Sequence, residues 1–312
     1  MSPAPARVEV LRSGYVEGWH EASLLAVDAT GVPVLALGEV ERPWFARSAN
    51  KPLQAAALLA LGWVPASPVE LALACASHSG EPGHVEVVRA VLGDLGPGAL
   101  GCPPDLPLDE PAARALLADG EGPQRLTMNC SGKHAAMLRT CLVNGWSTAG
   151  YLDPAHPLQQ GVQRELEDLV GEGVAHVAVD GCGAPQHSFT LAGLLRGYTR
   201  LVQERSPVVA AMRDHPWYVG GTGRDVTRLM EGVPGLVAKD GAEGVFAAAL
   251  PDGAAVAVKV HDGAARARTP LLVAGLRALG VIAPVLDELA ATPVLGGGRR
   301  VGEARVAYPQ PD

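Results

Sequence analysis

Lysine is scarce in this sequence. Among the 25 lysine and arginine residues, lysine occurs only at Lys51, Lys133, Lys239 and Lys259, so arginine supplies the general positive charge. An arginine side chain keeps its proton in proteins, whereas a buried lysine amine can lose its proton and act as a base, a nucleophile or a metal ligand. Each lysine is therefore a candidate for chemistry.

The sequence also lacks a basic cluster, a long apolar run and a leader-like start. A net charge of −8 and a pI near 5.6 argue against a nucleic-acid partner. No stretch approaches the roughly 18 apolar residues that a membrane span needs. The first residues, MSPAPARVEV, contain no apolar segment behind a basic start. We therefore expect a cytoplasmic protein with no nucleic-acid or membrane partner.

Cysteine is limited to five residues, which are odd in number and widely spaced: Cys75, Cys102, Cys130, Cys141 and Cys182. In a reducing compartment this pattern favours thiols used for packing, metal binding or catalysis over a disulfide framework.

The order of periodic segments predicts one sheet assembled from both chain ends. Short β-rich runs before residue 40 are typical of an antiparallel meander, and helical periodicity follows from Pro52 to about Gly171. Strand-like runs return at "LVAKDG", "GVFAAAL" and "AVAVKV", followed by a helix at "PLLVAGLRALGVI" and a last strand near "RVGEARVAY".

This order predicts an α/β (α+β) fold with a mostly antiparallel sheet and an inserted helical region. We expect a single catalytic domain over residues 1–312. Its sheet region would span about 1–50 and 232–312, and its helical region about 51–231.

The segment "ARSANKP" places Ser48 three residues before Lys51. On a helix that begins near residue 48 this spacing puts both side chains on one face, where a neutral lysine can take the proton of a serine. The alternative is a serine that caps the helix and an exposed lysine in its first turn.

Two further segments place serine or lysine at the end of an apolar run. "CASHSGEPGH" contains Ser77 and Ser79 and either lines the floor of a site or starts the next helix as a capping box. "LVAKDG" puts Lys239 at the end of a strand, which is similar to the K-T-G element of penicillin-recognising enzymes.

Two segments place cysteines in glycine-flanked turns. "MNCSGKHAAM" holds Cys130 and Lys133, and "VDGCGAP" holds Cys182 beside Asp180. Because neither segment is a C-x-x-C knuckle, spacing alone favours small buried thiols over zinc.

Together, "RSANKP", "CASHSGE", "NCSGKHAAML", "DGCGAP" and "AKDGAEG" resemble the bacterial L-asparaginase II family, the zinc-binding Ser–Lys amidohydrolases. The resemblance runs from about residue 8 to residue 280, and the tail after about residue 290 is poorly anchored. It implies hydrolysis of L-asparagine to L-aspartate and ammonia on a serine β-lactamase or penicillin-binding-protein-like fold, in a homodimer.

The resemblance also implies site residues. Two Ser–Lys pairs carry over to Ser48 with Lys51 and to Ser77 with Lys239, with Ser79 as the fallback for Ser77. A zinc site carries over to three further residues: Cys130, Lys133 and Cys182. Zinc is thus expected beside the active site, either catalytic or structural.

A small zwitterion needs one protein group of each sign, so Arg47 is the candidate for the α-carboxylate and Asp180 for the α-ammonium. Ser48 is expected to attack the amide with Lys51 as base, while the opposite assignment to Ser77 stays open. Two other functions also stay open. One is a β-lactamase or D,D-peptidase, although an S-D-N or Y-x-N element is not evident. The other is a non-catalytic zinc or amino-acid binding module.

Overall fold

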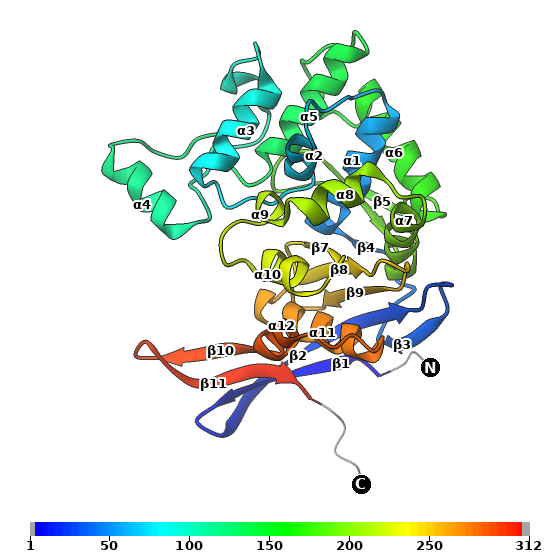
Figure 1. The fold of residues 1–312 in the computed structure, drawn as a ribbon, viewed down its shortest axis with the longest axis vertical. Coiled ribbons are helices and arrows are strands. Elements are labelled where there is room, and N and C mark those ends of the chain that lie inside the picture. Colours follow the sequence, from blue (N-terminus) through cyan, green and yellow to red (C-terminus); the bar gives the residue numbers. More distant parts are fainter. Residues whose placement is uncertain (1–3, 308–312) are drawn as a thin grey trace.

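The main sheet of the molecule combines strands from both ends of the chain. In a computed structural model, which describes residues 4–307, the strands follow the order β10-β11-β1-β2-β9-β8-β7, with β3 paired to β2 (Figure 1). All of these pairs are antiparallel. The strands are β1 (Ala6–Arg12), β2 (Tyr15–Val27), β3 (Pro33–Leu37), β7 (Val237–Asp240), β8 (Val245–Ala249), β9 (Ala255–Val260), β10 (Ala291–Gly296) and β11 (Arg299–Val306).

Helices cover both faces of the central strands. Every residue of β7, β8 and β9 is buried, which an antiparallel sheet shows only where both of its faces are packed. Helix α11 (Ala265–Ala278) contacts β2, β8, β9 and β11, and helix α7 (Leu191–Gln203) contacts β8 and β9. The alanine and valine content of β8 and β9 suits this position, because small and β-branched side chains fit between packed layers.

The remaining helices form a separate layer over one end of the sheet (Figure 1). Within residues 4–307, eight of them begin with proline in the first turn, where the missing N–H costs no hydrogen bond. They are α1 (Lys51–Ala60), α2 (Pro68–Ala74), α3 (Pro82–Leu92), α4 (Glu110–Ala118), α5 (Ser131–Val143), α6 (Pro157–Val170), α8 (Pro207–Asp214), α9 (Pro216–Val219) and α10 (Asp225–Gly232), with α12 (Pro284–Leu289) beside α11.

A second, three-stranded sheet lies within the helical region. It has the order β4-β6-β5, with β4 (Trp44–Phe45), β5 (His176–Val179) and β6 (Pro185–Phe189). The sequence analysis predicts no second sheet, because strands of two to five residues are too short to show a clear alternation. Its β5–β6 connection carries Asp180 and Cys182.

The predicted fold class is confirmed: the molecule is an α/β protein with an antiparallel sheet made from both chain ends and a helical region between them. The N-terminal meander and the strand near residues 300–308 are also present, although Tyr308 lies outside the described residues.

Helix α11 starts at Ala265 rather than at Pro270, which therefore lies inside the helix. Within residues 4–307, the helices fall short of the length and apolar character needed to cross a bilayer.

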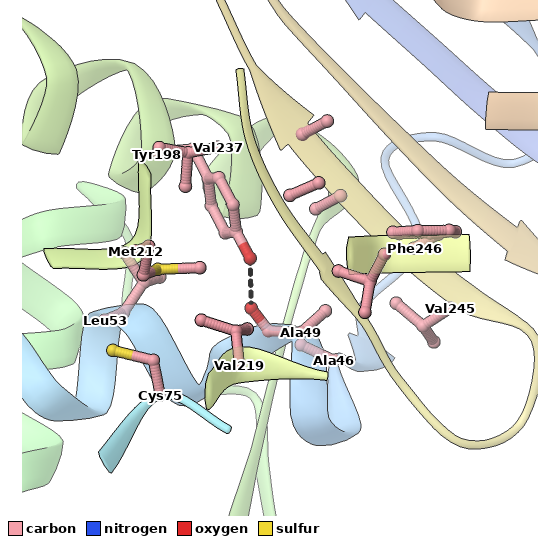
Figure 2. Packing of buried hydrophobic residues seen from close by; sticks show 14 of the residues in the cluster. Ala46, Ala49, Leu53, Cys75, Tyr198, Met212, Val219, Val237, Val245 and Phe246 are labelled. Carbon is pink, nitrogen blue, oxygen red and sulfur yellow. Dashed lines mark hydrogen bonds between the residues drawn. The ribbon is translucent and has the colours of Figure 1, made fainter. Parts of the chain in front are cut away.

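A buried tyrosine fixes the segment that contains Ser48 and Lys51. Residues Arg47–Asn50 form a 3₁₀ turn, η1, directly before α1. The hydroxyl of Tyr198 on α7 donates a hydrogen bond of 2.7 Å to the carbonyl oxygen of Ala49, within a packed cluster that includes Leu53 and Phe246 (Figure 2). The packing of α7 against the sheet thereby determines where this turn lies.

Candidate active site

Six of the nine predicted site residues line one small cavity of about 230 Å³. The other three, Lys51, Lys133 and Lys239, are buried and bond residues of the lining. Its lining comes from η1, from the loop after α2, from the residues before α4, α5 and α10, from the β5–β6 connection, from the end of β7 with the residues after it, and from α11. It includes Arg47, Ser48, Ser77, Cys130, Asp180 and Cys182, together with Arg224, Asp240 and Arg268. Two larger cavities, of about 700 and 860 Å³, contain none of the predicted residues. Segments distant in the sequence thus meet at a single polar cavity.

Lys51 is the first residue of α1, and its side chain is almost completely buried. Its amine donates to the carbonyl oxygen of Ala76, and it lies 3.1 Å from the hydroxyl of Ser77 and 3.1 Å from the thiol sulfur of Cys130. This lysine therefore joins three segments: α1, the loop after α2 and the start of α5.

The Ser–Lys hydrogen bond differs from the predicted pair. The amine of Lys51 bonds Ser77, and among the described residues the side chain of Ser48 makes no hydrogen bond. The sequence prediction assumed one helix starting near residue 48, but Ser48 lies in η1 and Lys51 begins α1. Ser48 nevertheless lines the same cavity.

The loop after α2 holds Ser77 in place through its backbone. The amide of Ser77 donates to the carbonyl oxygen of Val219, and the amide of His78 donates to that of Asn129. The side chain of Ser79 is turned away, since its hydroxyl donates to the carbonyl oxygen of Gly220 at 2.9 Å. Ser77 lines the cavity and Ser79 does not, so the geometry favours Ser77 as the functional position.

Lys239, at the end of β7, is fully buried and bonded to its own neighbour. Its amine donates to the backbone oxygen of Asp240 at 2.6 Å and to the carboxylate of the same residue. Burial lowers the pKa of Lys239 to about 8, although Asp240 opposes this shift, and the nearby charge of Lys51 adds to it. Lys239 thus pairs with Asp240 rather than with Ser77 as predicted.

Asp240 is a buried carboxylate shared by three cations. Its second oxygen accepts hydrogen bonds from Arg224 at 3.0 Å and from Arg268 at 2.9 Å. Burial would raise the pKa of Asp240, but Lys239, Arg268 and Arg224 outweigh it and hold that pKa well below its usual range. Arg268 also donates to the carbonyl oxygen of Gly241 at 2.7 Å.

Arg47 and Asp180, which both line the cavity, bond each other. The Nε of Arg47 donates to Asp180 at 2.8 Å, and Glu243 lies 3.9 Å from the same guanidinium. Arg47 has a φ of 50°, a left-handed conformation that disfavours side chains other than glycine. The hydrogen bond to Asp180 helps to hold this strained residue beside Ser48.

The predicted metal ligands also meet at this cavity. The amine of Lys133 lies 3.2 Å from the thiol sulfur of Cys182, and both Cys130 and Cys182 line the cavity. The neighbouring Cys130 and Lys133 lower the pKa of Cys182 far below its usual range, while Cys182 and burial raise the pKa of Cys130. Cys182 is therefore the thiol of the two that more readily loses its proton.

The donor set fits zinc in its chemistry. Two sulfurs and one nitrogen are ligands that zinc prefers, and three protein ligands leave a fourth position open. Residues 4–307 contain no group of three or more His, Cys, Asp or Glu side chains placed for a metal, and the predicted set supplies only two such residues besides Lys133. Binding would require Lys133 and both thiols to release their protons. Zinc stays a prediction.

Sequence reasoning missed Arg224, Arg268 and Asp240. The arginines were set aside because arginine is the general surface cation of this chain. A signal for Asp240 was present, since it follows Lys239 in a strand that reads as buried, and a buried charge requires partners.

Comparisons with known proteins place the chain in a family. The sequence pattern that describes L-asparaginase II matches residues 8–306. No curated protein matches the chain. Among solved structures, the chain is similar to a β-lactamase from Mycobacterium bovis, with 15% identity, 78% of this chain and 88% of that chain covered, and a TM-score of 0.35, a likeness from which we draw no argument. The match over nearly the whole sequence supports an amidohydrolase, and the chain belongs to the L-asparaginase II family.

Proposed function

We propose that the protein hydrolyses L-asparagine to L-aspartate and ammonia through a serine that a lysine activates. The observation that carries this proposal is the 3.1 Å contact between the amine of Lys51 and the hydroxyl of Ser77 at the wall of a small polar cavity. A neutral amine at this distance can remove the hydroxyl proton as the oxygen attacks a carbonyl carbon.

The reaction proceeds in two steps. In the first, the oxygen of Ser77 bonds to the side-chain amide carbon of asparagine, Lys51 takes the hydroxyl proton, and that proton passes to the departing nitrogen, which leaves as ammonia. In the second, water attacks the β-aspartyl ester, Lys51 accepts its proton, and the serine oxygen recovers a proton as L-aspartate leaves. The contact favours Ser77 over the predicted Ser48 as the attacking group.

Ser48 and Lys239 are proposed as supporting groups. Ser48 lines the cavity and offers a second hydroxyl near the reacting amide. Lys239 contributes positive potential from behind Asp240, and with a pKa of about 8 it can also exchange a proton near neutral pH. Asp180 is the proposed partner of the α-ammonium, because its carboxylate lines the cavity, and the assignment of Arg47 to the α-carboxylate is tested below.

We also propose that Cys130, Lys133 and Cys182 bind zinc beside this site. The contact between Lys133 and Cys182 and the position of both cysteines on the cavity lining support the proposal. The metal would supply a Lewis acid or a rigid link between α5 and the β5–β6 connection. A cytoplasmic homodimer is the proposed state of the enzyme, which size-exclusion chromatography with light scattering would check.

A coupled ammonia assay tests the function. Purified protein is offered asparagine, glutamine and the β-lactam nitrocefin, and zinc content is measured on the same sample. Ammonia from asparagine without nitrocefin turnover supports the proposal. Nitrocefin turnover without ammonia would replace it with a β-lactamase, and tight asparagine binding without any turnover would replace it with a binding module.

Mass spectrometry tests the nucleophile. A slow asparagine analogue is used to trap the acyl-enzyme, and the modified peptide is then identified. Label on Ser77 supports the proposed assignment, and label on Ser48 would reverse the two serines. Label on neither serine would rule out the covalent scheme.

A further inference from the structure

On one wall of the cavity, the cations outnumber the carboxylates that they bond among residues 4–307. Lys239, Arg224 and Arg268 all bond the single carboxylate of Asp240, so three cations share one anion. Both arginines and Asp240 line the cavity, while Lys239 lies behind them. A net charge of this sign on a partly desolvated wall attracts an anion, because the low surrounding dielectric strengthens the interaction.

The charges differ among the lining residues around Arg47 and Asp180. There Arg47 bonds Asp180 at 2.8 Å and faces Glu243 at 3.9 Å, so one cation is set against two carboxylates. An arginine already neutralised in this way attracts a further carboxylate less than an arginine in an excess of cations. The cavity is therefore positive on the side of Asp240 and neutral or negative on the side of Asp180.

The arginines of the positive wall are held rigidly while leaving donors unused. Arg268 uses its two terminal nitrogens on Gly241 and Asp240. Arg224 uses one terminal nitrogen on Asp240, and its other terminal nitrogen lies only at 3.5 Å from Ser79. A guanidinium carries five N–H donors, so Arg224 keeps several that a cavity anion can receive without reorganisation.

We propose that Arg224 and Arg268, fixed by Asp240, form the subsite for the α-carboxylate and restrict the enzyme to amino acids whose α-carboxylate is free. This inference rests on the proposed function and moves the carboxylate away from Arg47. The substrate then spans the cavity with its carboxylate at the Asp240 wall, its ammonium toward Asp180, and its side-chain amide near Ser77. Asparagine within a peptide, or with its carboxylate esterified, lacks the charge that this wall requires.

The test compares L-asparagine with its α-methyl ester, which keeps the amide and the ammonium but loses the negative charge. The measured quantity is the ratio of kcat/KM for the two substrates, which does not depend on how much of a variant is folded. In the wild type the ratio strongly favours L-asparagine. In Arg224→Gln it falls by about 10- to 100-fold, the loss expected for a hydrogen bond to a charged group. Arg224→Lys keeps the positive charge but loses the planar guanidinium group. Its ratio therefore lies between those of the wild type and Arg224→Gln.

Two further variants provide the controls. Arg228→Gln removes an arginine one turn along the same helix, where it bonds Glu288 away from the cavity, and it keeps the wild-type ratio. Arg47→Gln lowers activity on both substrates alike and leaves the ratio near that of the wild type. A ratio that falls in Arg47→Gln and not in Arg224→Gln would overturn the inference.

A binding measurement separates this inference from the proposed function. Calorimetry on the Ser48→Ala/Ser77→Ala variant gives the affinity for L-asparagine and for the ester, with and without Arg224→Gln. If the wild type does not hydrolyse asparagine but binding depends on Arg224 and on the free carboxylate, the subsite stands and the proposed function falls. If the enzyme hydrolyses asparagine and Arg224→Gln binds both compounds as before, the subsite falls and the function stands. If there is neither turnover nor binding, both fall.

Discussion

The buried lysines beside the cavity have different partners on its two sides. We call the side of α1 and α5 the helical wall and the side of β7 the sheet wall. On the helical wall, Lys51 and Lys133 contact hydroxyl, carbonyl and thiol groups. On the sheet wall, Lys239 is bonded to the carboxylate of Asp240, which two arginines also hold. The partners on the first wall can exchange protons or bind metal, whereas those on the second are a carboxylate and two guanidinium groups that keep their charges. We infer that bond making belongs to the helical wall and substrate orientation to the sheet wall.

The largest expected effect comes from the helical wall. In Lys51→Arg the positive charge stays, but arginine cannot give up its proton, so the base is lost. We expect kcat for ammonia release to fall by about 10²- to 10⁴-fold, the range of general acid–base catalysis. A melting curve close to that of the wild type would show that the fold is kept. Near-normal turnover in this variant would remove Lys51 from the chemistry and break the division between the walls.

The next effect concerns the sheet wall and appears as a dependence of stability on pH. The pKa of Lys239 is lowered to about 8 from 10.5, so its burial is unfavourable while it is charged. Between these values the unfolded chain binds the proton and the folded chain does not, so stability rises with pH. Relative to Lys239→Met, the wild type should gain about 2 to 3 kcal/mol between pH 7 and pH 10.

Urea unfolding of both proteins at several pH values measures this difference. The comparison with Lys239→Met is needed because buried thiols act in the opposite direction: burial raises the pKa of Cys75 to about 12 and that of Cys141 to about 11. A difference that stays flat over this range would mean that Lys239 keeps its proton and acts only as a fixed charge.

The smallest effect concerns the hydrogen bond by which Tyr198 on α7 holds η1 in place. Tyr198→Phe removes the hydrogen bond to Ala49 and leaves a buried carbonyl oxygen without that donor. We expect a loss of about 1 to 3 kcal/mol in the free energy of unfolding. Because η1 carries Ser48 and leads into Lys51, kcat should fall together with stability. A normal kcat in a destabilised variant would show that α7 supports the fold without positioning the site.

The sequence indicated which segments form the site but not which side chains meet there. Ser48 lines the cavity, Lys51 bonds Ser77 of the lining, and Lys239 bonds Asp240 of the lining. The partner of Lys51 depends on the tertiary fold, because Lys51 meets Ser77 where α1 lies beside α2. Lys239 instead bonds its neighbour in the chain, and the sequence did not reveal this pair because successive side chains of a strand normally point to opposite faces.

Close backbone contacts explain other details that the sequence could not give. A Cβ at Gly132 would lie 2.6 Å from the carbonyl oxygen of Leu73, so α5 approaches α2 through this glycine and brings Cys130 beside Lys51. A Cβ at Gly241 would lie 3.0 Å from the carbonyl oxygen of Ala46, so the residues after β7 can approach η1. A glycine in the sequence does not reveal which neighbour requires it.

The sheet built from both chain ends has a consequence for synthesis on the ribosome. Strand β2 can pair with β1 and β3 as soon as these strands are synthesised. The pairing of Ala22 with Val260 and of Val8 with Val306 becomes possible only after the C-terminal strands have been synthesised. At about 5 to 20 residues per second, the edges of the first strands stay without partners for on the order of ten seconds or more. During that interval an exposed edge can pair with another nascent chain or be covered by a chaperone. The yield of folded enzyme in a cell therefore depends on how the first thirty residues are protected until the last strands emerge.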